Sequence, residues 1–198
     1  MEESDFDFTI KLLIVGDTCV GKTNFISVFM GNTFSENYMT TSGIDLKTTK
    51  IEIRNKKIRI QLWDTAGQEK YRAITKTLFL KVQGILILYD ITKEISFNHL
   101  KDWIKSIREE CGSQIQLLIV GNKSDLNESR IIEKEKALAY AEEEKIKYIE
   151  TSSKTGENIQ KAISLLCEKI IDNTEISGDF SFTIDAGSLS KKNKGKCC

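Results

Sequence analysis

The sequence contains no proline, a single histidine (His99) and no CxxC pair among its five cysteines. Zinc sites are built from clusters of cysteine and histidine, so this composition predicts no zinc site. The chain starts with acidic residues and lacks the basic and then apolar pattern of a secretory signal. In such a chain, an odd number of cysteines argues against a disulfide framework. We expect Cys111 and Cys167 to be partly buried, inert thiols. The absence of proline reflects composition rather than any particular chemistry.

Long apolar runs and an excess of charge of either sign are also missing. The longest apolar runs, LLIV and ILIL, have the length of strands, whereas a membrane span needs roughly 18 residues. The 29 basic and 29 acidic residues balance, which gives no reason to expect nucleic acid as a partner. We therefore expect one soluble, intracellular domain, because 198 residues suffice to bury a core.

Apolar runs alternate with helical patterns from residue 8 onward. This alternation predicts a doubly wound, mostly parallel α/β sheet of six strands, with one antiparallel edge strand and helices on both faces. After residue 172 the periodicity stops, so we expect an N-terminal extension (1–7), a domain (8–172) and a mobile tail (173–198). Ser96 is the expected N-cap of its helix, and Trp103 on that helix is expected in the core. The predicted strands are 8–15, 47–54, 58–63, 84–90, 115–121 and 147–150, and the predicted helices are 22–31, 96–110, 133–145 and 157–172.

The segment GDTCVGKT (16–23) follows the first strand and opens a helix, and it matches the pattern GxxxxGK[ST] completely. Gly16 and Gly21 allow the backbone to fold round phosphates, which its N–H groups and the helix N-terminus attract. Lys22 adds a positive charge at the β and γ phosphates, and the Thr23 hydroxyl can ligate Mg²⁺. The alternative, a glycine-containing turn without a ligand, is disfavoured by the strand–loop–helix context. The residues expected to contact the nucleotide here are Thr18, Cys19, Val20, Gly21, Lys22, Thr23 and Asn24.

The segment WDTAGQE (63–69) follows the third predicted strand. The Asp64 carboxylate can hold the water molecules of a metal ion at the strand end. Gly67 offers an unobstructed backbone N–H, and the amide of Gln68 can orient an attacking water. The DxxG pattern alone is a weak signal, because Asp and Gly commonly end strands. Paired with the phosphate loop, the DxxG pattern becomes a strong signal.

The segments GNKSD (121–125) and TSSK (151–154) also follow predicted strands, where ligands of such sheets bind. Asp125 can accept hydrogen bonds from the N1–H and the exocyclic amine of guanine, a donor pair that adenine lacks. Asn122 and Lys123 would brace the loop and cover the ring. Read alone, NKSD would fit an ordinary polar turn equally well. The backbone that would meet the guanine O6 belongs to Ser152, Ser153 and Lys154.

Taken together, these motifs resemble the small GTPases of the Ras superfamily. Over residues 8–172 the sequence is similar to the Rab family, closest to its secretory-pathway branch. The resemblance implies the small-GTPase fold and a membrane-anchored switch that binds GTP or GDP with Mg²⁺, hydrolyses GTP and recruits effectors in vesicle trafficking. The segments that carry it are YMTTSGIDLK, IQLWDTAGQEKYRAIT, GILILYDIT, SFNHLKDWI, LLIVGNKSDL and ETSSKTGENI.

The resemblance also assigns two switch segments, 33–46 and 66–81, which order around GTP. Thr41 matches the threonine that joins Mg²⁺ beside the γ-phosphate, and Gln68 matches the glutamine that orients water. No arginine stands where the family would place an arginine finger, so we expect slow turnover that an activating protein accelerates. Some activators of this family supply a glutamine as well. The implied catalytic residues are Lys22, Thr41 and Gln68, and the implied metal ligands are Thr23, Thr41 and Asp64.

Departures from the family pattern fall on the partner surface. Ser42 replaces an aliphatic residue, and LFLKV (78–82) replaces a tyrosine-rich segment. The usual aromatic trio is reduced to Trp63, so we expect an unusual set of effectors. Cys19 stands where the family often has glycine, and we expect it to act through its backbone, with a redox role as the less favoured alternative. The predicted effector surface consists of Ile44, Leu46, Trp63 and Leu78.

The chain ends in KKNKGKCC (191–198). Rab proteins often end in paired cysteines that carry geranylgeranyl groups, and Cys197 and Cys198 match that placement. Because the ending is no CaaX box, modification would need the Rab escort and prenyltransferase machinery. Two lipids and the neighbouring lysines would supply stable anchoring. The alternative is two free thiols on a frayed end.

The resemblance implies a monomer on the cytoplasmic face of an intracellular or plasma membrane, with a cytosolic GDP-bound pool. Its implied partners are an exchange factor, an activating protein, a GDP-dissociation inhibitor and effectors, but no nucleic acid. Two other functions are disfavoured by the sequence. A nucleotide-binding module without hydrolysis is disfavoured by Gln68, Thr41 and Lys22. An ATP-using kinase is disfavoured by NKSD and by the lack of an arginine-rich lid.

Overall fold

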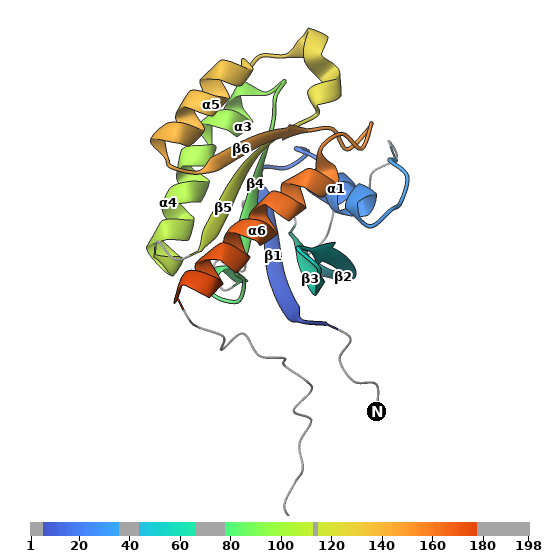
Figure 1. Cartoon of the computed structure of the whole chain (residues 1–198). Helices are drawn as coiled ribbons and strands as arrows, with labels where there is room; N and C mark the ends of the chain where they lie inside the picture. The colour runs from blue at the N-terminus through green and yellow to red at the C-terminus, as the bar shows by residue number, and fades with distance from the viewer. Residues whose placement is uncertain (1–5, 36–43, 66–77, 113–114, 178–198) are drawn as a thin grey trace, which may run out of the picture.

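The computed structural model describes residues 6–35, 44–65, 78–112 and 115–177, and in them six strands form one sheet (Figure 1). The strand order is β2-β3-β1-β4-β5-β6. β2 is antiparallel to β3, and all other neighbours are parallel. The predicted fold class is confirmed. The strands are β1 (Phe8–Gly16), β2 (Ile44–Ile53), β3 (Lys56–Thr65), β4 (Gly84–Asp90), β5 (Gln116–Asn122) and β6 (Lys147–Thr151).

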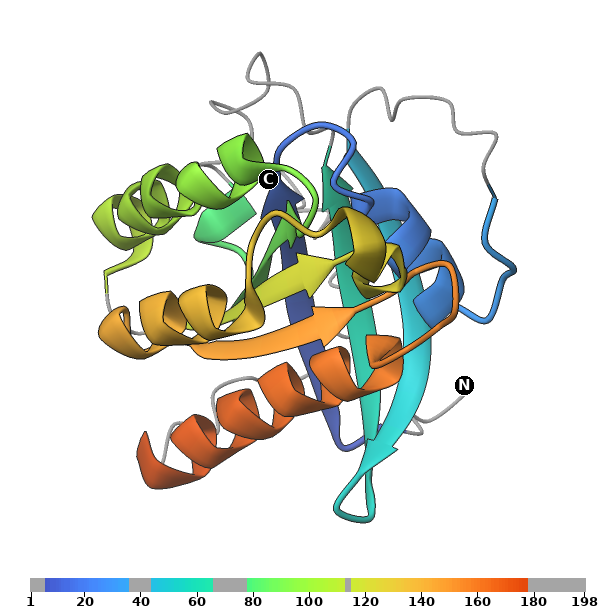
Figure 2. The same ribbon diagram turned by 90° about the horizontal axis from the view of Figure 1, so that it is seen from above.

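Side chains alternate between two cores because successive residues of a strand point to opposite faces. On β1, Leu12 and Ile14 pack against α1 (Lys22–Phe29) and α6 (Ile159–Ser177). Leu13 and Val15 pack on the other face, with α3 (Glu94–Asn98), α4 (Leu100–Cys111) and α5 (Lys134–Glu143). Figure 2 shows α4 and α5 on one side of the sheet and α6 on the other. Both faces of β4 and β5 are therefore covered, which explains their continuous apolar sequences.

The hairpin between β2 and β3 turns at Arg54 and Asn55, whose φ angles are 52° and 61°. Two left-handed residues in succession match the right-handed twist of the flanking strands. β2 begins at Ile44, three residues before the predicted start, and forms the antiparallel edge of the sheet.

The helix predicted over 96–110 is two helices, α3 and α4, which meet at His99. The expected N-cap was wrong, because the first helix already begins at Glu94 and contains Ser96. The Ser96 hydroxyl instead accepts a hydrogen bond from the Asp90 N–H (3.1 Å) and donates one to the Lys93 carbonyl (2.8 Å). Trp103 is buried as predicted.

The last helix, α6, continues to Ser177, so the predicted end at residue 172 was too early. Its buried face includes Cys167, and burial raises the pKa of this thiol to about 12. Cys111 on α4 is half-buried, and desolvation also raises its pKa. Both thiols stay protonated at neutral pH, as expected for structural cysteines. Among the helices that the structure describes, none combines the length and the apolar character that a membrane crossing requires.

Candidate functional site

The loops that follow β1, β5 and β6 lie at one end of the sheet (Figure 1). This is the carboxyl edge of the parallel strands, where ligands of open α/β sheets bind. The structure therefore brings together the phosphate loop (16–23), the Asp64 carboxylate at the end of β3, the NKSD segment and the TSSK segment.

The phosphate loop requires glycine at both of its ends. A Cβ at Gly16 would lie 2.1 Å from the Leu88 carbonyl oxygen, and one at Gly21 would lie 2.4 Å from Asn122 Nδ2. Both glycines also have positive φ angles, 138° and 97°, which side-chain-bearing residues rarely adopt. Gly21 is the N-cap of α1, so the loop leads straight into a helix N-terminus, which attracts anions.

Lys22 is buried inside this loop. Its ammonium donates hydrogen bonds to the carbonyls of Gly16 (2.9 Å) and Asp17 (2.7 Å). Burial lowers the pKa of Lys22 to about 8, although the nearby carboxylates of Asp64 and Asp17 oppose that shift. The ammonium is thus a partly desolvated charge, and a phosphate beside it would restore its ordinary pKa.

The other predicted contacts of this loop differ in exposure. Thr18 and Cys19 are exposed, Val20 is buried and Asn24 is half-buried. Cys19 has a φ angle of 64°, so the backbone there takes a left-handed turn. The amide of Asn24 donates to the Ser35 carbonyl at 3.3 Å.

Thr23 and Asp64 meet at the junction of α1 and β3. The Thr23 hydroxyl donates to Asp64 Oδ2 at 2.5 Å, and Asp64 is only 2% exposed. Hydroxyl and carboxylate oxygens are the hard donors that Mg²⁺ prefers. The two side chains therefore fit a magnesium site beside the phosphate loop.

Asn122, at the end of β5, joins three of the predicted motifs. Its Nδ2 donates to the Val20 carbonyl in the phosphate loop at 2.8 Å. Its Oδ1 accepts from the hydroxyls of Thr151 (3.1 Å) and Ser153 (3.4 Å) in the TSSK segment. Asn122 is buried, so these bonds fix the phosphate loop and the two loops beside it as one unit.

Asp125 and Ser152 face each other across the NKSD and TSSK segments. The Ser152 hydroxyl donates to Asp125 Oδ1 at 2.5 Å. The same hydroxyl accepts from the backbone N–H groups of Lys154 and Thr155, both at 3.1 Å. Asp125 itself is exposed, so its carboxylate is oriented by Ser152 and accessible from outside.

Lys123 is held by Asp90, a residue that the sequence analysis did not select. Lys123 Nζ lies 2.6 Å from Asp90 Oδ2, and Asp90 is fully buried. Burial by itself would raise the pKa of Asp90, but hydrogen bonds from Lys123 and Thr92 outweigh it and keep the pKa below its ordinary value. Its place at the carboxyl end of the apolar run GILILYD is the signal that could have identified it.

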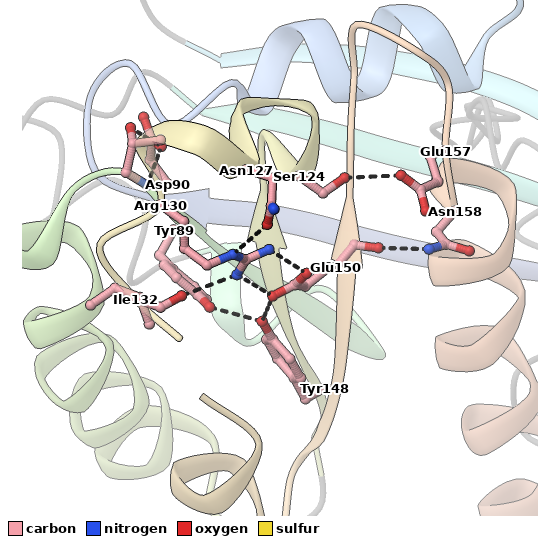
Figure 3. A network of polar contacts seen from close by, with 11 residues as sticks. Tyr89, Asp90, Ser124, Asn127, Arg130, Ile132, Tyr148, Glu150, Glu157 and Asn158 are labelled. Carbon is pink, nitrogen blue, oxygen red and sulfur yellow. Dashed lines mark hydrogen bonds and ion pairs between the residues drawn. The ribbon is translucent and has the colours of Figure 1, made fainter. Parts of the chain in front are cut away.

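Behind these loops lies a polar network that the sequence analysis also missed (Figure 3). Arg130 makes two parallel hydrogen bonds to Glu150, of 2.8 and 2.9 Å. The Tyr148 hydroxyl donates to Glu150 at 2.8 Å and lies 2.9 Å from the Tyr89 hydroxyl. The network ties the segment after β5 to β6, so it fixes the spacing of NKSD and TSSK. No local sequence pattern predicts this network, because its residues belong to β4, to β6 and to the segment that follows β5.

Several predicted residues lie outside the described part of the chain. They are Thr41, Gly67, Gln68, Cys197 and Cys198, together with the side chain of Ile44. The rest of the predicted effector surface is divided. Leu46 is exposed and pairs with the half-buried Trp63 across β2 and β3, but Leu78 is buried in the core, so the structure does not place it beside them on the surface.

Comparison with known proteins finds matches over most of the chain. A model of the Ras family matches residues 11–172. The chain is 39% identical over 196 residues to Ras-related protein Rab-13 of Rattus norvegicus, covering 97% of each protein. It is 38% identical over 193 residues to Rab-8B of Homo sapiens, covering 96% of this chain and 93% of that protein. It is 41% identical over 168 residues to RABE1e of Arabidopsis thaliana, covering 84% of this chain and 77% of that protein.

Proposed function

The chain belongs to the Rab branch of the Ras family of small GTPases, a GTP-hydrolysing switch of vesicle trafficking, and we propose how its residues divide the work of that switch. The loop 16–23 binds the phosphates, Thr23 and Asp64 hold Mg²⁺, and Asp125 selects guanine. The observation that carries this assignment is Asn122, whose hydrogen bonds fasten the phosphate loop to the two base-side segments.

On the phosphate side, the backbone N–H groups of Thr18, Cys19, Val20 and their neighbours surround the β-phosphate. Lys22 supplies its charge to the β and γ phosphates, and the carbonyls of Gly16 and Asp17 aim that charge. Mg²⁺, when bound, neutralises charge that develops on the phosphates. Thr41 joins the metal ligands and Gln68 orients the attacking water; both roles follow from the family pattern.

On the base side, Asp125 accepts the guanine N1–H and exocyclic amine. The Ser152 hydroxyl holds the carboxylate in place for this contact. Adenine offers no such pair of donors, so it would leave the carboxylate without its partners, which costs orders of magnitude in affinity. The backbone of Ser152, Ser153 and Lys154 faces the guanine O6.

The decisive test is nucleotide competition. Purified chain is first loaded with fluorescent GDP. GTP should then displace this label at concentrations at which ATP leaves the label bound. Asp125→Ala should narrow the difference between GTP and ATP as competitors, whereas Glu128→Ala, a matched exposed carboxylate on the same short helix (η2, Ser124–Ser129), should leave that difference unchanged. Equal displacement by ATP and GTP would contradict the role of Asp125.

A second variant tests the metal site. Thr23→Asn should weaken the binding of Mg²⁺–GTP more than the binding of GDP, and an equal loss of both affinities would remove Thr23 from the metal site.

Membrane attachment follows from the two C-terminal cysteines. We propose that Cys197 and Cys198 receive geranylgeranyl groups, so that the chain associates peripherally with the cytoplasmic face of an intracellular or plasma membrane and cycles through a cytosolic GDP-bound pool. Family membership supports this proposal. We also propose that residues 1–7 form an N-terminal extension, that residues 8–172 belong to the GTPase domain, whose last helix continues to Ser177, and that the tail beyond it carries the two cysteines. Removing the last two residues should release a tagged protein from membranes, and unchanged membrane binding would refute the proposed lipidation.

The same membership supports a set of regulators. They comprise an exchange factor, an activating protein, a GDP-dissociation inhibitor, the escort and prenyltransferase machinery, and effectors. Among the described residues, the exposed Leu46 and the half-buried Trp63, which pair across β2 and β3, are the two that effectors would contact.

A further inference from the structure

Asp17, the second residue of the phosphate loop, is bound by two side chains that are far from it in the sequence. Its Oδ2 lies 2.6 Å from His99 Nδ1, and its Oδ1 accepts a hydrogen bond from Trp103 Nε1 at 3.2 Å. These partners are 82 and 86 residues away in sequence. The carboxylate of Asp17 is 20% exposed, so it is largely enclosed by this contact.

Residue 17 is also joined to the phosphate-binding lysine. The Asp17 carbonyl accepts a hydrogen bond from Lys22 Nζ at 2.7 Å, beside the bond from the same ammonium to the Gly16 carbonyl. The side chain of Asp17 therefore fixes the loop to α4, while its main chain fixes the ammonium. The hydrogen bonds that connect His99 and Trp103 to Lys22 therefore all pass through Asp17.

The two donors suit this task in different ways. Trp103 is buried in the core between α4 and the sheet, so its indole N–H has a fixed position. His99 stands where α3 ends and α4 begins. An ionised carboxylate only accepts hydrogen bonds, so His99 Nδ1 must carry a proton in this contact. Each carboxylate oxygen thus receives its own donor, which fixes both position and rotation of the group.

The contact with His99 and Trp103 also reduces an electrostatic repulsion between Asp17 and the ligand. An acidic side chain in a loop that receives phosphates opposes the negative charge of the ligand. Two donors hold the Asp17 carboxylate against α4 and offset its charge there. The loop can then present backbone N–H groups and Lys22 to the ligand.

We propose that His99 and Trp103 are positioning residues for nucleotide binding, acting through Asp17 on the phosphate loop and on Lys22. Their contact slows the release of nucleotide. This inference rests on the proposed function, because it requires guanine nucleotide on the 16–23 loop. It adds a link between that loop and the junction of α3 and α4, which none of the nucleotide motifs contains.

The test is the release rate of fluorescent GDP in excess unlabelled GDP. His99→Leu removes the donor, whereas His99→Asn keeps an amide donor at the same δ position. Trp103→Phe removes the indole N–H but keeps an aromatic ring. Lys101→Leu, on the exposed side of the same helix, is the matched control.

We expect His99→Leu and Trp103→Phe to release GDP about three- to tenfold faster than the parent chain, which is less than the full loss of a hydrogen bond to a charged group because the contact reaches the nucleotide only through Asp17. His99→Asn and Lys101→Leu should stay near the parent rate. In an Asp17→Ala background, His99→Leu should have no further effect, because the contact acts through Asp17. A purely structural role would speed release in both backgrounds.

The outcomes separate the two proposals. A parent chain that retains GDP no better than ADP overturns the proposed function and this inference together. If the parent retains GDP but His99→Leu behaves like Lys101→Leu, the inference fails and the proposed function stands. Equal effects of His99→Leu with and without Asp17 overturn it as well. Because His99 is half-exposed, its variants are expected to fold, which keeps the test decisive even where Trp103→Phe loosens the core.

Discussion

Replacing Arg130 by Met should strongly destabilise the fold, although Arg130 is absent from all the nucleotide motifs. Its guanidinium and the Glu150 carboxylate are each 11% exposed and joined by two parallel hydrogen bonds. Removing one partner of a buried ion pair leaves an uncompensated charge, at a cost of about 3–5 kcal/mol. Tyr148 continues to donate to Glu150 in the variant, so we expect the lower end, about 3 kcal/mol in the free energy of unfolding.

The loss should depend on pH in a defined direction. Burial alone would raise the pKa of Glu150, but hydrogen bonds from Arg130 and Tyr148 outweigh it and hold the pKa below its ordinary value. The carboxylate therefore stabilises the parent chain above its unfolded pKa, about 4.3, and this contribution is lost as the pH falls through the lower folded pKa. Without Arg130, burial dominates, and the ionised form of Glu150 becomes a penalty. The difference between parent and variant should be largest near neutral pH and should shrink toward pH 4.

Urea unfolding from pH 4 to 8, at fixed GDP and Mg²⁺, measures this difference. The matched control is Arg108→Met, because Arg108 pairs with Glu144 at the surface, where the side chains are 47% and 24% exposed. Surface pairs contribute at most about 1 kcal/mol. Adding Glu150→Leu to Arg130→Met should recover much of the loss, since no charge is then left buried. A loss below that of the control, or a loss that does not change with pH, would refute the reasoning.

Three further predictions concern the site. Because the pKa of Lys22 is about 8, its ammonium loses charge above that pH, and GDP affinity should fall by about tenfold between pH 7 and 9; a flat titration would contradict this. Gly121→Ala should lower the free energy of unfolding by about 1–3 kcal/mol, since its Cβ would lie 2.8 Å from the hydroxyls of Tyr89 and Tyr148; an unchanged urea midpoint would show that the tyrosines move aside. Gln68→Leu should slow single-turnover GTP hydrolysis without weakening GTP binding, and an unchanged rate would remove Gln68 from the mechanism.

The fold could be predicted from the sequence because its signals are local. Continuous apolar runs such as 84–90 are typical of strands covered on both faces, and both β4 and β5 are buried along their whole length. The motifs could be placed at one edge of the sheet because each follows a strand. Helix ends were less predictable. The apolar spacing passes unbroken through His99, so it could not reveal that two helices meet there.

The partners of the site residues could not be predicted, because they depend on strand order rather than on spacing. β1 lies beside β4 in the sheet, so the segment that follows β4 meets the phosphate loop that follows β1. Asp17 and His99 thereby come within 2.6 Å although 82 residues separate them. The pairing of Arg130 with Glu150 has the same origin, since β5 lies beside β6. A charged residue just beyond a strand end is a candidate for such a pairing, but its partner is known only once the order is known.

That order also explains why phosphate and base recognition are mechanically connected. At the carboxyl edge, each neighbouring pair of the parallel strands is joined by a polar contact between the segments that follow or end those strands. These contacts fix the loops relative to one another, and Asn122 adds direct bonds from the base side to the phosphate loop. A guanine nucleotide lying across the edge would then meet loops that are already positioned, so less conformational entropy would be lost on binding. In their order along the sheet, the joining pairs are Thr23–Asp64, Asp17–His99, Asp90–Lys123 and Asp125–Ser152.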